Sequence, residues 1–125
     1  MNSNDDVKKF MLAGDQQVYD TPGVPDDRVA QGTLYMKLIS EEFTELALAW
    51  TEEDIVEIAD ACADLKWVIE GLEHSLGIPQ QAVWDEVARS NMSKLVDGKL
   101  IKREDGKVLK PDTFVPPDIK SILNT

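Results

Sequence analysis

Three glutamates, Glu41, Glu42 and Glu45, interrupt what would otherwise be the apolar face of a long helix. At about 100° per residue, Glu41 and Glu45 point in the same direction as Leu38 and the leucines around it. Glu42 lies beside them. Carboxylates that face a packed surface lose hydration and repel one another, and both effects are unfavourable. A bound divalent cation would offset both, so this pattern indicates a metal site.

A second acidic group follows in the next helical segment. Glu57, Asp60 and Asp64 recur at positions i, i+3 and i+7, which places them on one helix face over two turns. The two groups could therefore face each other across one cleft. Coordination by oxygen alone suits Mg²⁺, with Mn²⁺ as the substitute, and Mg²⁺ keeps several waters that leave room for a phosphorylated substrate. All six acids are candidate ligands.

Basic residues gather late in this acidic chain. More than half of the 13 lysines and arginines lie between Arg89 and Lys110. A metal-bound polyphosphate needs carboxylates for the cation and Lys or Arg for its outer oxygens, and this chain offers both. The alternative interpretation is a solvated, charge-balanced tail.

Helices are the elements that must position these residues. Apolar periodicity and breaker residues predict helices over about 4–18, 26–50, 51–76, 79–93 and 118–123. We expect Asn4 or Ser3 to cap the first helix and Asp26 or Asp27 to cap the second. Thr51 and Asp54 have the spacing of a capping box for the third.

The expected fold is all-α, with a four-helix bundle-like core and a short C-terminal hairpin or tail. We expect one domain over 1–125, with a helical core over about 4–94 and a substrate-covering tail over about 95–125. Within the tail, Asp105-Gly106 favours a two-stranded ribbon over 99–110. The second helix is apolar almost all round apart from its glutamates, so we expect it to be central in the fold or shared with another subunit.

Charge and hydropathy exclude several classes of protein. The chain carries 24 acidic and 13 basic residues, net −11, which argues against stable binding to nucleic acid or to an anionic membrane. No apolar run approaches the roughly 18 residues of a membrane span. The first residues are polar instead of resembling a signal peptide, so a cytoplasmic location is expected.

Neither Cys62 nor His74 is expected to do chemistry. Cys62 is the sole cysteine, and its small apolar neighbours indicate a buried core residue. His74 falls on a helix face near Glu70 and Glu73 that we expect to be exposed.

With these residues identified, the chain resembles the all-α nucleoside triphosphate pyrophosphohydrolases. This is the MazG-like group, which includes the phosphoribosyl-ATP pyrophosphohydrolases. The run Glu41-Glu42-x-x-Glu45 is similar to that family's E-E-x-x-E, and Glu57-x-x-Asp60 to its E-x-x-D.

Two downstream elements resemble the dUTP diphosphatase branch of the group, and the likeness extends over roughly 10–122. They are Ser90-Asn91-Met92-Ser93-Lys94 and Asp105-Gly106-Lys107-Val108-Leu109-Lys110-Pro111. The register on the third helix stays open. If the downstream segment sets it, Asp64 takes the family aspartate position and Ala61 the glutamate position.

The resemblance implies a four-helix core, often dimeric or tetrameric, which binds Mg²⁺ and cleaves a nucleoside triphosphate, dUTP among the candidates, to the monophosphate and pyrophosphate. It implies that Glu42 and Glu45, with Glu57, Asp60 or Asp64, bind the metal. Glu41 or another glutamate of the first motif would orient or deprotonate the attacking water. Asn91 and Lys94 would contact phosphate or sugar, and Lys107 and Lys110 could close over the substrate.

Two alternatives remain at this level. The first is phosphoribosyl-ATP pyrophosphohydrolase, which makes the same cleavage, although the hairpin-like tail argues mildly against it. The second is a non-catalytic acidic protein that binds a divalent cation or occupies a basic partner. A mimic of nucleic acid would spread acids over its surface, whereas these acids interrupt an apolar stripe.

Overall fold

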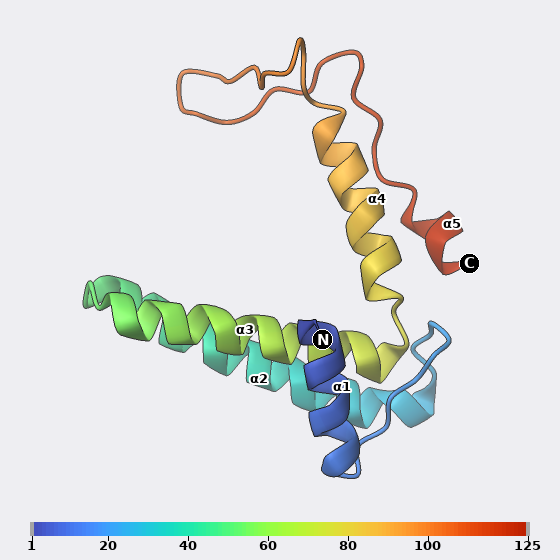
Figure 1. The fold of residues 1–125 in the computed structure, drawn as a ribbon. Helices are drawn as coiled ribbons and strands as arrows, with labels where there is room; N and C mark the ends of the chain where they lie inside the picture. The colour runs from blue at the N-terminus through green and yellow to red at the C-terminus, as the bar shows by residue number, and fades with distance from the viewer. Residues whose placement is uncertain (1, 125) are drawn as a thin grey trace. The chain divides into compact units, whose positions relative to one another are not determined.

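The computed structural model describes residues 2–124 and is helical throughout its regular parts. Its elements in chain order are α1 (Ser3–Ala13), α2 (Asp26–Thr51), α3 (Ile55–Leu76), α4 (Gln80–Met92) and α5 (Ile119–Leu123), as Figure 1 shows. The all-α prediction is confirmed, and residues 2–124 contain no strand. The chain divides into two compact units, Met1–Pro79 and Gln80–Thr125. The expectation of a single domain stays a prediction.

In the first unit, α2 and α3 lie side by side as an antiparallel pair (Figure 1). The turn between them is tight, with Glu53 in the left-handed region at φ 55°. Asp54 then caps α3, because its side chain accepts hydrogen bonds from the backbone N–H groups of Val56 and Glu57. The predicted capping box is therefore wrong in one member, since Thr51 belongs to α2.

The core of this unit forms where α1 packs on α3. Val7 and Met11 of α1 are fully buried and lie in one cluster with Tyr35 of α2 and Val68 of α3. The Tyr35 ring rests on α3 at Gly71, where a Cβ would lie 2.1 Å from the ring. Close approach of α2 and α3 at this point therefore depends on the missing side chain.

The first helix ends earlier than predicted, at Ala13 instead of about residue 18, and Asn2 caps it instead of Asn4 or Ser3. In the segment that follows α1, the side chain of Gln31 forms two hydrogen bonds with the backbone of Gln17. Gln31 accepts from the Gln17 N–H at 3.0 Å and donates to the Gln17 carbonyl at 2.7 Å. These contacts replace the helical bonds that a longer α1 would make.

The exposure predicted for His74 and the burial predicted for Cys62 are both wrong. His74 is only 9% exposed, because α1 covers this face of α3, and its ring Nε2 lies 2.9 Å from the Asn4 carbonyl oxygen. Glu70, on the same face, accepts a hydrogen bond from the Ser3 hydroxyl at 2.8 Å. Cys62 is exposed. The cap predicted at Asp26 or Asp27 is also absent, since Pro25 precedes the helix and no side chain caps it.

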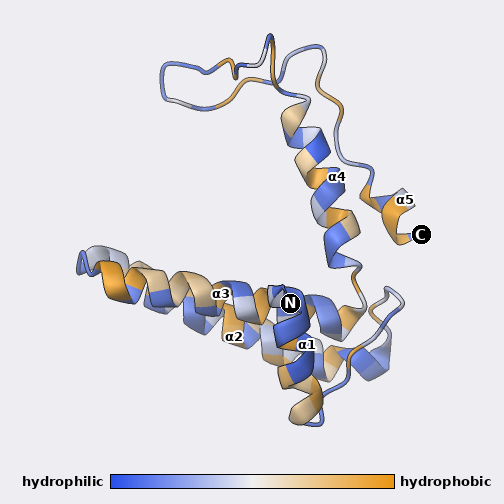
Figure 2. Ribbon diagram, in the orientation of Figure 1, coloured by the Kyte–Doolittle hydropathy of each residue, from blue (hydrophilic) through white to orange (hydrophobic). Residues whose placement is uncertain are grey.

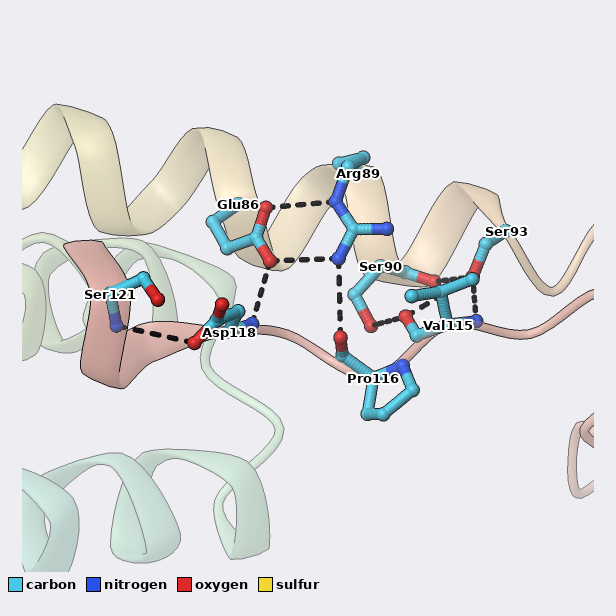
Figure 3. A network of polar contacts seen from close by, with 8 residues as sticks. All are labelled: Glu86, Arg89, Ser90, Ser93, Val115, Pro116, Asp118 and Ser121. Atoms are coloured by element: carbon cyan, nitrogen blue, oxygen red, sulfur yellow. Dashed lines mark hydrogen bonds and ion pairs between the residues drawn. The ribbon is translucent and has the colours of Figure 1, made fainter.

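In the second unit, the chain after α4 folds back along that helix and is held by polar contacts (Figure 3). The Glu86 carboxylate accepts from the Asp118 N–H at 2.6 Å and pairs with Arg89 at 2.7 Å. These bonds lower the pKa of Glu86 to about 2, so the carboxylate stays charged in acid. Further contacts in Figure 3 join Arg89 to Pro116, Ser90 to Val115 and Ser93 to Val115.

The predicted ribbon over 99–110 forms only in part. Two isolated antiparallel bridges occur, between Val96 and Lys99 and between Lys102 and Val108. Gly106 adopts φ 85°, as the Asp-Gly turn requires. No longer ladder follows among residues 2–124, so the segment is a loop with two bridges.

Apolar and polar residues are mixed around each long helix, as the colouring in Figure 2 shows. Accordingly, no helix within residues 2–124 is both long and apolar enough to cross a bilayer.

The contact between Tyr35 and Gly71 is tested by a matched pair of substitutions. Gly71→Ala should destabilise the protein by about 1–3 kcal/mol, because the new methyl group overlaps the ring. Gly32→Ala on α2 should be neutral or stabilising by up to about 1 kcal/mol, because its methyl group would meet Leu76 at an ordinary 3.7 Å. Thermal denaturation followed by circular dichroism measures both. Equal melting temperatures for the two variants would contradict this packing.

Candidate metal centre

Three carboxylates from two helices converge in the first unit. Glu42 and Glu45 lie three residues apart on α2 and so share a face, and Asp64 stands opposite on α3. One oxygen from each lies within 4.8 Å of the other two. Neither helix alone could form this group, because each supplies only part of it.

The environment of the cluster disfavours its negative charge. Burial raises the pKa of Glu42, and so does a hydrogen bond that its protonated carboxyl donates to Glu45. Charge repulsion from Glu45, Asp64 and Asp60 raises it further. Burial also raises the pKa of Asp64, followed by repulsion from Asp60 and Glu45. Both shifts mean that the protein's own groups do not offset the negative charge of these carboxylates.

The arrangement fits a hard divalent cation. The Oε2 atom of Glu42 is buried and has no hydrogen-bond partner, a condition that costs about 1–3 kcal/mol for an ordinary acceptor. The ion pairs within residues 2–124 are Glu86–Arg89 and Arg103–Asp105, so no Lys or Arg neutralises the cluster. Oxygen donors of this kind are those that Mg²⁺ and Mn²⁺ accept.

The structure brings together three of the six predicted ligands. Asp60 is exposed and outside the cluster, although its charge affects Glu42 and Asp64. Glu41 and Glu57 are exposed and also lie outside it. Ala61 is buried at 4% exposure, and its methyl side chain offers no oxygen. Among the third-helix acids, Asp64 therefore faces the first motif. Which of the six acids bind a metal stays a prediction.

The predicted substrate residues lie in the second unit, and two of the four, Lys94 and Lys110, lie near one aromatic ring. The Lys94 ammonium donates to the Asn91 side chain at 3.2 Å. Lys94 and Lys110 approach the Phe114 ring, with ammonium-to-centroid distances of 5.6 Å and 5.3 Å. Lys107 is exposed and takes no part in this group. Phe114 was not among the predicted functional residues, although it is the only aromatic residue after Trp84.

The raised pKa values predict how stability depends on pH in the absence of metal. The folded state holds the protons of Glu42 and Asp64 more tightly than the unfolded state does. In EDTA the free energy of unfolding should therefore fall as pH rises above about 4, through the raised pKa values. Glu42→Gln should reduce this fall, because it removes one of the repelling charges.

Melting temperatures from pH 4 to 7 in EDTA measure this dependence. Glu53→Gln, in the exposed turn between α2 and α3, is the matched control and should behave like the original protein. Parallel curves for the original protein and Glu42→Gln would contradict the electrostatic account of the cluster.

Comparison with known proteins agrees with this geometry. The family model for phosphoribosyl-ATP pyrophosphohydrolase matches residues 7–91, a span that includes α2, α3 and all three clustered carboxylates. Comparison with curated proteins finds no match. The match confirms the wider MazG-like resemblance, and the dUTP diphosphatase branch stays a prediction. The chain belongs to the phosphoribosyl-ATP pyrophosphohydrolase family, which implies a hydrolase that releases pyrophosphate from a nucleotide with the help of a divalent cation.

Proposed function

We propose that this protein is a Mg²⁺-dependent nucleoside triphosphate pyrophosphohydrolase. It would cleave ribo- or deoxyribonucleoside triphosphates, dUTP among them, between the α and β phosphates, releasing the monophosphate and pyrophosphate. The convergence of Glu42, Glu45 and Asp64 carries this proposal. Phosphoryl transfer depends chiefly on positioning and charge neutralisation, so three carboxylates and a cation are sufficient without a protein nucleophile.

The acids have distinct roles in this proposal. Glu42, Glu45 and Asp64 hold the cation, and Asp60 and Glu57 stand along α3 as further oxygen donors. When bound, Mg²⁺ lowers the pKa of water and neutralises phosphate charge. Glu41 is exposed on α2 and directly precedes Glu42. In this proposal it orients the attacking water or accepts its proton.

In this proposal, the residues to which the family resemblance gives substrate contacts keep that role. Lys94, Lys107 and Lys110 would bind outer phosphate oxygens, and Asn91 would bind phosphate or sugar. Their positive charge complements the polyphosphate, whereas most of the chain is acidic.

A substrate panel with a matched pair of variants tests the activity. The purified protein is incubated with canonical, deoxy and modified triphosphates, with Mg²⁺ or with EDTA, and pyrophosphate is resolved from orthophosphate. Pyrophosphate should appear only with the cation. Glu45→Gln should lower turnover by at least about 100-fold, because it removes one charged ligand. Glu53→Gln should leave turnover unchanged.

Circular dichroism should show Glu45→Gln folded, since the substitution also relieves repulsion within the cluster. A folded Glu45→Gln variant with full activity would contradict its role. Binding of Mg²⁺ without hydrolysis of any triphosphate would support the alternative of a non-catalytic cation-binding protein.

A second candidate activity is phosphoribosyl-ATP hydrolysis, which the name of the matching family favours. The reaction breaks the same α–β bond, so the cluster serves both. Direct comparison of kcat/KM for phosphoribosyl-ATP and for the best triphosphate distinguishes the two.

We also propose that the protein acts as a homodimer or homotetramer. Large apolar side chains lie in water at the α2–α3 turn: Trp50 is 73% exposed, Ile55 74% and Val56 72%. Exposed apolar surface of this kind is typical of an interface. A cytoplasmic location and the lack of stable nucleic-acid binding stay predictions from composition.

Ile55→Glu tests the oligomer. A carboxylate at the first residue of α3 suits the positive end of the helix dipole, so the subunit should stay folded. Burying that charge in an interface would be unfavourable, so the variant should be monomeric at concentrations at which the original protein is not. Sedimentation velocity measures this. Val24→Glu, in the loop before α2 and similarly exposed at 69%, is the control. Equal masses for the original protein and Ile55→Glu would contradict the proposal.

A further inference from the structure

Hydrogen bonds made by its neighbours in the chain place Phe114 at the end of α4. On one side, the Thr113 hydroxyl donates to the Ser93 carbonyl at 3.3 Å. On the other, the Val115 N–H donates to the Ser93 hydroxyl at 2.9 Å. The Phe114 N–H itself donates to the Pro111 carbonyl at 3.0 Å, closing a turn. These bonds place Phe114, whose side chain is half-buried, next to the end of α4.

Two ammonium groups far apart in sequence meet at this ring. Lys94 closely follows α4 and Lys110 follows the loop, and both lie within the roughly 6 Å at which the negative face of an aromatic ring attracts a cation. Both ammonium groups are attracted to one ring, although their like charges repel each other. Within residues 2–124 neither lysine forms an ion pair that would offset the repulsion, whereas Arg103 in the same loop pairs with Asp105. The positive charge is therefore available to an anion.

The loop contains an internal comparison for Lys110. The sequence Asp97-Gly98-Lys99-Leu100-Ile101-Lys102 is repeated as Asp105-Gly106-Lys107-Val108-Leu109-Lys110. Lys102 and Lys110 thus take equivalent places, at the end of each repeat. Of these two lysines, only Lys110 approaches an aromatic ring in the described structure. Lys110 therefore differs from Lys102 because Phe114 lies near it, and not because of its place in the repeat.

We propose that Phe114 is a positioning residue that holds Lys94 and Lys110 over its ring so that the two ammonium groups act as one site for an oligophosphate chain. The identity of this anion as part of a substrate rests on the proposed function. The grouping of the two lysines does not, because it follows from the distances to the ring.

The grouping is tested first without metal or nucleotide. Lysine side-chain resonances are followed by NMR while inorganic tripolyphosphate is titrated into the full-length protein at low salt in EDTA. The resonances of Lys94 and Lys110 should shift along one curve with a common Kd. Phe114→Leu should raise this Kd by about 3- to 10-fold, because it keeps the apolar bulk and removes the ring. Phe114→Trp should restore it.

Lys102→Ala is the matched control and removes one charge from the equivalent place in the first repeat. It should leave the common Kd within about 2-fold, after allowance for net charge. Separate Kd values for Lys94 and Lys110, no binding, or equal weakening by Lys102→Ala and Phe114→Leu would overturn the proposal.

Kinetics then separates this inference from the proposed function. With an active triphosphate, Phe114→Leu should raise KM by a similar factor and leave kcat nearly unchanged. Hydrolysis with an unaltered KM in Phe114→Leu would overturn the positioning role alone. Tripolyphosphate binding that depends on Phe114, without hydrolysis of any nucleotide, would contradict the proposed function and leave the paired-lysine site standing.

Discussion

The contact of Tyr35 with Gly71 sets the register on which the candidate site depends. Because α2 and α3 are antiparallel, a step of seven residues from Tyr35 toward the turn reaches Glu42, and the same step back along α3 from Gly71 reaches Asp64. Two helical turns thus separate the contact of Tyr35 with Gly71 from the carboxylate cluster. A shift of α3 by one residue would rotate Asp64 by about 100° away from α2.

The sequence was sufficient to predict the helices and the acidic pattern, because hydrophobic periodicity and breaker residues are local, whereas the caps of α1 and α2 were wrongly predicted. It could not select among Glu57, Asp60 and Asp64, since that choice depends on the register just described. The exposure of His74 was wrongly predicted for a related reason. Its face of α3 is covered by α1, and the sequence gives no direct measure of which faces of two helices meet.

The second unit shows the same limit on a smaller scale. Its lysines were recognised as candidates from composition, yet Lys107 stays apart while Lys94 and Lys110 meet at Phe114. That meeting depends on how the chain after the loop returns to α4. The Asp-Gly signal correctly placed a turn, but the flanking residues form single bridges, because no further strand extends the ladder.

The return of the chain along α4 depends on hydrogen bonds at the surface and not on a core, since no apolar residue within 80–124 is fully buried. Segments attached in this way open locally at a small fraction of the global free energy of unfolding. Amide exchange and limited proteolysis would therefore reach residues near 96–117 while the first unit is intact. The carboxylate of Glu86 keeps its charge far into acid, so acidification would release this segment late.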